Sequence, residues 1–150
     1  MAIITIDEVL EHAERFEQML ADYYSGLAEH TTREGVRLLT DYMSRHRVRL
    51  KEALEKLSPE IVERIRKERI RYEPQAADCR CFEGIDLPDD ATAAQVLDAA
   101  VTLDECLVRL YRQVVRQSTD PDVQDVFESL VRLEERDEIE LKKIKAMDYF

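Results

Sequence analysis

The sequence predicts an all-α protein, a four-helix bundle built from two helical hairpins. The chain has 150 residues, the size of one ordinary domain, and we expect residues 1–150 to form a single domain. It contains only three glycines and four prolines, so few positions favour a turn. Four long segments have apolar residues that recur in steps of three and four, the spacing of an amphipathic helix. A few long helices therefore fit this chain better than many short strands.

The first hairpin is predicted from two of these segments. The first helix is expected to begin at Thr5, because Thr5 and Glu8 have the spacing of a capping box. Its apolar positions are Val9, Ala13, Phe16, Leu20, Tyr24 and Leu27. The second helix is expected to begin at Thr31 or Thr32, since Thr31 and Glu34 repeat the capping-box spacing. It continues through Val36, Leu39, Met43, Leu50, Ala53 and Leu57.

The second hairpin follows the same logic. The third helix is expected to begin at Thr92, with Gln95 three residues later. Its apolar positions are Val96, Ala100, Leu107, Tyr111 and Val114. The fourth helix follows the sequence STDPD, in which Pro121 suits the first turn of a helix. Its apolar positions are Val123, Val126, Phe127, Leu130, Leu141 and Ile144.

A long connection joins the two hairpins. Ser58, Pro59 and Glu60 read as the cap and first turn of a short extra helix, on which the basic run of residues 64–71 is also expected to lie. Residues 72–90 hold most of the turn-forming residues and read as irregular. A connection of this length can cross the bundle from end to end. We therefore expect the third helix to run parallel to the second.

Charge and composition exclude several classes of partner. The chain has 33 acidic and 22 basic residues, so its formal charge of −11 makes nucleic acid and anionic membrane poor partners. No basic region precedes the first acids, as a signal peptide would require, and we expect a cytoplasmic protein. Cys79, Cys81 and Cys106 are odd in number and suit a reducing compartment better than a disulfide scaffold. The simplest role for Cys106 is helix packing.

Five polar residues interrupt the apolar stripes near the middle of the four helices. They are Glu17, His46, Asp104, Glu134 and Asp137. An isolated carboxylate costs several kcal/mol to bury unless it is neutralised, paired or coordinated. Because every helix contributes at least one of these residues, they predict a shared polar site inside the bundle, with all five as candidate metal ligands.

The two halves of the chain also repeat one another. An acid precedes a tyrosine by seven residues in each half, as Glu17–Tyr24 and Asp104–Tyr111. A second pair follows with a spacing of three, as Met43–His46 and Glu134–Asp137. Residues three apart share a face of a helix, so each of these later pairs can address one centre.

This combination resembles the ferritin-like superfamily, in particular its small rubrerythrin-like members. In that family a lone Glu on the first and third helices joins a Glu-x-x-His on the second and fourth helices around two iron or manganese ions. The resemblance covers nearly the whole chain and implies a ferritin-like bundle. Glu17 matches the first lone Glu, Asp104 matches the second, and His46 and Glu134 match as they stand.

Two positions depart from the family pattern. Asp137 stands where the second His would be, and Met43 stands where one bridging Glu would be. A thioether is a poor ligand for iron or manganese ions, so the resemblance implies an altered site that holds two ions, one ion or none. It further implies chemistry on oxygen or peroxide, an external electron donor and a homodimer.

Two readings of the inward acids stay open on the sequence alone. In the first, Glu134 bridges and the other four residues are terminal ligands of iron or manganese in an oxidoreductase. In the second, the acids share protons and hydrogen bonds with His46 and the tyrosines, without metal. The protein is then a non-enzymatic helical bundle that serves self-association or partner binding.

Overall fold

A computed structural model of the chain describes residues 2–72 and 77–147. Within these residues the protein is an all-α helical bundle, which confirms the predicted fold class. The helices are α1 (Ile6–His30), α2 (Glu34–Glu55), α3 (Pro59–Ile65), α4 (Ala93–Gln117) and α5 (Pro121–Met147). Two short strands, β1 (Ala2–Thr5) and β2 (Arg69–Tyr72), and a 3-10 turn, η1 (Cys79–Phe82), complete the described elements.

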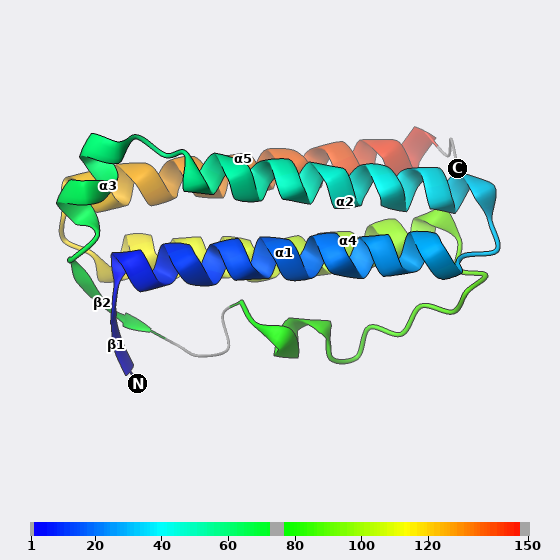
Figure 1. Ribbon diagram of the computed structural model, residues 1–150, viewed down its shortest axis with the longest axis horizontal. Helices are drawn as coiled ribbons and strands as arrows, with labels where there is room; N and C mark the ends of the chain where they lie inside the picture. The colour runs from blue at the N-terminus through cyan, green and yellow to red at the C-terminus, as the bar shows by residue number, and fades with distance from the viewer. Residues whose placement is uncertain (1, 73–76, 148–150) are drawn as a thin grey trace.

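The four long helices form the two expected hairpins. α1 packs along α2, and α4 packs along α5, and the α1–α2 hairpin lies in front of the α4–α5 hairpin in the view of Figure 1. The connection between the hairpins includes the short helix α3 and then runs back along the bundle to its opposite end (Figure 1). As a result α2 and α4 run in the same direction, as the length of the connection predicts. None of the described helices is long and apolar enough to span a membrane.

Three of the predicted helix starts are confirmed. The Thr5 hydroxyl accepts a hydrogen bond from the Glu8 backbone N–H at 3.2 Å. Thr92 and Gln95 form a complete capping box, since each side chain accepts from the other's backbone N–H. Pro121 is the first residue of α5.

The predicted start of α2 at Thr31 or Thr32 is wrong by a few residues. The helix begins at Glu34, and Arg33 occupies the cap position. The Thr31 hydroxyl accepts from the Arg33 backbone N–H at 3.2 Å, so it stabilises the loop between the helices. Thr31 itself ends α1, with its N–H donating to the Leu27 carbonyl at 2.9 Å. The capping-box spacing is present in the sequence, but the hydroxyl is used by the turn.

The strand pair β1–β2 is absent from the sequence prediction. The strands are antiparallel, with Ile4 opposite Ile70. The short helix α3 ends at Ile65, so the expectation that the whole basic run of residues 64–71 lies on it is wrong. The pairing also serves α1, because the Ile6 N–H donates to the Glu68 carbonyl at 2.8 Å. The first turn of a helix has N–H groups without intrahelical partners, so this contact satisfies one of them.

A disulfide ties the long connection to the bundle. It joins Cys81 in η1 to Cys106 in α4, with their Cα atoms 6.5 Å apart. The expectation that Cys106 is a simple packing residue is therefore wrong. Next to the disulfide, the Phe82 ring lies 5.8 Å from Phe16 and 5.3 Å from Tyr23, measured between ring centroids. The connection is thus anchored both covalently to α4 and by aromatic packing on α1.

Candidate functional site

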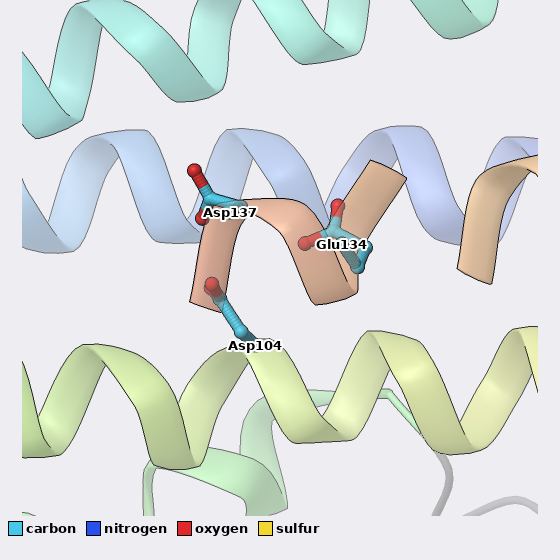
Figure 2. Close-up of side chains that lie close together, drawn as sticks. All are labelled: Asp104, Glu134 and Asp137. Carbon is cyan, nitrogen blue, oxygen red and sulfur yellow. The ribbon is translucent and has the colours of Figure 1, made fainter. Parts of the chain in front are cut away.

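The acids predicted to point inward meet in the middle of the bundle. Glu17 on α1, Asp104 on α4 and Glu134 on α5 are each at most 2% exposed. Asp137 lies one turn after Glu134 and is mostly buried, with 12% of its side chain exposed. Figure 2 shows Asp104 pointing from α4 toward the two acids of α5. The sequence pattern therefore placed all four carboxylates at one site.

The residue at the centre of these acids is Arg47, which the sequence reading missed. Arg47 projects from α2 and is 2% exposed. Its Nη1 atom lies 3.2 Å from both carboxylate oxygens of Glu17 and from both of Glu134. Its Nη2 atom donates to Asp137 at 2.8 Å and also to Asp104. One guanidinium thus contacts all four carboxylates, on three different helices.

His46 lies at the edge of this cluster, outside its centre. Its Nε2 atom is 2.8 Å from an Asp137 oxygen, and 29% of its side chain is exposed. Its ring stacks on Tyr42, with ring centroids 6.0 Å apart. His46 therefore covers the outer side of Asp137, while the neighbouring Arg47 fills the interior position that the sequence reading gave to His46.

Two tyrosines line the cluster from α1 and α4. Tyr24 and Tyr111 are both 1% exposed, and burial is the main reason that their pKa values lie well above the usual value. Among the described residues, the Tyr24 hydroxyl and Asp104 Oδ2 are buried polar atoms without a hydrogen-bond partner. Tyr111 packs against Phe127, with ring centroids 5.9 Å apart. These contacts make the tyrosines part of the core around the acids.

Burial raises the pKa of two of the acids. Desolvation is the largest influence on Glu17 and outweighs the Arg47 charge, while Glu134 adds repulsion and a hydrogen bond, so the pKa of Glu17 rises to about 8. Desolvation likewise raises the pKa of Asp104 well above its usual value, supported by a hydrogen bond to Asp137. Burial therefore disfavours the charged form of both Glu17 and Asp104, in spite of the Arg47 guanidinium beside them.

The other charges of the cluster are held by their neighbours. Burial alone would raise the pKa of Asp137, but hydrogen bonds with His46 and Asp104 and the Arg47 charge outweigh it and lower that pKa. Burial also opposes the charge of Arg47, yet the surrounding carboxylates raise its pKa well above the usual value. Arg47 is therefore a permanent buried cation that faces all four carboxylates.

The donor atoms do not fit two metal ions as they are arranged. The group of described residues with metal-binding spacing is Asp104, Glu134 and Asp137, whose oxygen atoms lie within 4.8 Å of one another. Glu17 and His46 lie outside that group, although both were predicted as ligands. The Arg47 guanidinium already contacts an oxygen of each of the three acids. A metal ion would have to share or replace these contacts.

No family model matches this sequence, and neither a curated protein nor a solved structure shows significant similarity to it. The residues of the central cluster are therefore the basis on which a function is inferred. They combine one permanent cation and four carboxylates.

Proposed function

We propose that the chain is a non-enzymatic, ferritin-like helical module for self-association or partner binding, in which Arg47 serves as the internal cation. The observation that carries this proposal is the set of contacts between one guanidinium and all four inward carboxylates. Four buried acids on three helices need positive charge nearby. Arg47 supplies it from the chain itself, so the fold does not depend on iron or manganese.

The chemistry of the guanidinium supports this role. An arginine side chain has five N–H donors in a planar fork and does not lose its proton in proteins. Here the two terminal nitrogens of Arg47 reach oxygens on α1, α4 and α5. A buried ion network of this kind specifies how helices dock more than it adds stability. Arg47 therefore selects one arrangement of the two hairpins.

Exposed apolar side chains on α2 and α5 supply contact area for association. Leu38 is 59% exposed and Tyr42 is 47% exposed, and because they are four residues apart they share one face of α2. On α5, Ile139 is 54% exposed. A homodimer through this side of the bundle belongs to the proposal, and light scattering of the purified protein tests it.

Metal reconstitution of an Arg47→Ala variant tests the proposal most sharply. If Arg47 takes the place of a metal ion, the variant leaves a hollow lined by four acids that can accept a divalent cation. We expect added Mn²⁺ to raise the melting temperature of Arg47→Ala and to leave that of the unchanged protein where it is. An Arg47→Ala, Glu134→Gln variant is the matched control and should lose the response to Mn²⁺.

The contrary result is a wild-type protein that binds metal with Arg47 in place. Elemental analysis that finds one or two ions per chain after anaerobic loading with ferrous iron would overturn the metal-independent function. If the metal-free Arg47→Ala variant is as stable as the unchanged protein, that result would also contradict the role of Arg47 as the internal cation.

A metal-binding function is the second candidate, and one observation favours it. Asp104, Glu134 and Asp137 have the spacing of a metal site, and Asp104 Oδ2 has no hydrogen-bond partner among the described residues. Hard carboxylate oxygens suit iron or manganese. In that case the protein is a rubrerythrin-like oxidoreductase that acts on oxygen or peroxide with an external electron donor. The same elemental analysis decides between the two functions.

A further inference from the structure

The short helix α3 lies beside α5 near one end of the bundle (Figure 1). An apolar groove is lined by residues of both helices. Its volume is about 460 Å³, within the range of small-molecule sites. The apolar side chains that line it come from α3, α5 and the segment that joins α2 to α3. They are Leu57, Ile61, Val62, Val126, Leu130 and Leu133. Because Ile61 is 43% exposed, part of this lining faces solvent.

Two arginines stand beside this apolar lining. Arg132 and Arg136 are four residues apart on α5 and both line the groove. Arg132 donates to the Ser129 hydroxyl at 3.1 Å. In the described part of the chain, neither arginine forms an ion pair with a carboxylate. By contrast, nearby Arg64 pairs with Asp120 at 2.9 Å.

In the described part of the chain, Arg132 and Arg136 lack ion pairs although the protein is rich in acidic residues. The protein has 33 acidic side chains and a formal charge of −11, so partners for surface arginines are plentiful. Positive charge without a partner next to an exposed apolar hollow is complementary to a molecule that joins an apolar body to an anionic group. The Ser58 and Ser129 hydroxyls, which also line the groove, offer further donors to that group.

We propose that this groove binds a long-chain alkyl carboxylate, taken up as a free monomer. The alkyl chain lies along the apolar side chains of α3 and α5, and the carboxylate is held by Arg132 and Arg136. An arginine fork matches a carboxylate geometrically, and the alkyl chain gains free energy for each methylene removed from water. This proposal goes beyond the function proposed above and holds whether or not the bundle centre binds metal.

The size of the groove favours a small ligand over a protein. Ten residues line it, whereas a stable protein interface involves about 20 to 30 residues on each side. A second copy of the chain or a peptide helix would have to extend well beyond the groove. The unpaired arginines also disfavour a cationic or neutral chain as the occupant.

Calorimetric titration with dodecanoate, below its micelle concentration, tests the proposal. We expect one dodecanoate per chain, and octanoate should bind at least about tenfold more weakly because four methylenes are absent. Arg136→Gln should weaken dodecanoate binding by about tenfold, since it removes a charged hydrogen-bond donor. Arg49→Gln is the matched control, because Arg49 is an arginine of α2 outside the groove, and it should bind as the unchanged protein does.

Several results would overturn the proposal. These are no binding of dodecanoate, equal binding in Arg136→Gln, or equally tight binding of dodecyltrimethylammonium. Methyl NMR gives a second readout, because dodecanoate must shift the signals of Ile61 and Leu133, and shifts confined to other parts of the bundle contradict the site. Light scattering that shows a dimer dissociated by Ile61→Glu would assign the groove to a second copy instead. None of these results depends on Arg47, so they are distinguishable from failure of the metal-independent function.

Discussion

The two hairpins have the same architecture and opposite roles in the central cluster. The α4–α5 hairpin contributes three of the carboxylates, Asp104, Glu134 and Asp137. The α1–α2 hairpin contributes one carboxylate, Glu17, and the only arginine that contacts the cluster among the described residues, Arg47. The α4–α5 hairpin alone would bury three carboxylates without the Arg47 cation that contacts all of them. The two hairpins therefore share the sequence repeat that predicts their helices, but their charges differ. Contacts between the Arg47 cation of one hairpin and the three acids of the other join the two hairpins.

Removal of the Arg47 guanidinium, which joins the two hairpins, should have the largest effect on the free energy of unfolding. Arg47→Met keeps the bulk of the side chain but leaves the acids of both hairpins without positive charge. We expect the free energy of unfolding to fall by about 3–5 kcal/mol, the cost of breaking a buried ion pair. Urea denaturation at pH 8 measures it, and the loss should shrink at pH 5 because the acids can then take up protons.

Arg49→Met is the control for this variant. Arg49 lies two residues further along α2 at the surface, with its guanidinium 6.0 Å from the Tyr42 ring centroid. The free energy of unfolding should change by no more than about 0.5 kcal/mol there. Equal effects of the two substitutions would show that Arg47 does not join the hairpins electrostatically.

Substitution of the acids should distinguish Asp137, whose pKa is lowered, from Asp104, whose pKa is raised. Asp137→Asn removes the negative charge that faces Arg47 and His46, so we expect a loss of about 2 kcal/mol of stability. Asp104→Asn puts an uncharged side chain of nearly the same size where burial already disfavours a charge by raising the pKa of Asp104, so the loss should be below about 1 kcal/mol. Thermal unfolding at pH 7 compares the two variants, and the reverse order would contradict the opposite pKa directions of the two acids.

The pH dependence of stability should report the proton on Glu17. Its pKa is raised from 4.5 to about 8 in the folded protein, so the folded state holds a proton that the unfolded chain has released. The free energy of unfolding should therefore fall as the pH rises from about 5 to about 8, by at most about 1.4 kcal/mol per unit for this proton.

Glu17→Gln is the variant that sharpens this test. The amide cannot titrate but can still donate to Glu134 and accept from Arg47. Chemical denaturation across this pH range should give a shallower decline in Glu17→Gln than in the unchanged protein. Parallel curves for the two proteins would mean that Glu17 is ionised in the folded state.

The smallest effect is expected at His46. Its side chain is 29% exposed and contacts the cluster through Asp137 alone among the four acids. His46→Gln keeps a donor near Asp137, so we expect a loss of about 0.5 kcal/mol or less near neutral pH. A melting-temperature comparison checks this, and a loss as large as that of Arg47→Met would place His46 in the centre of the cluster.

The fold was largely predictable because local signals and periodicity agree. Thr92 with Gln95 and Pro121 mark helix starts through contacts within a few residues, and the structure contains these features. The strand pair and the disulfide were not predictable in the same way. Ile4 pairs with Ile70, and Cys81 pairs with Cys106 25 residues away, so both depend on how distant segments meet.

The four acids of the candidate site could be predicted from the sequence, but its cation, Arg47, could not be predicted from the apolar stripe. On α2, both His46 and Arg47 satisfy steps of three and four between Met43 and Leu50. Neighbouring residues point about 100° apart on a helix, so the apolar stripe alone cannot choose between them. The signal that could have chosen is charge, since four inward acids need a nearby cation and an arginine side chain always carries one.

A crystal structure of the protein soaked in Mn²⁺, with anomalous diffraction data, tests the central claim most directly. We predict guanidinium density of Arg47 between the carboxylates of Glu17, Asp104 and Glu134, with no anomalous peak among them. An anomalous peak at that position, with Arg47 displaced from the four acids, would contradict the claim that this bundle holds its charges together without a metal.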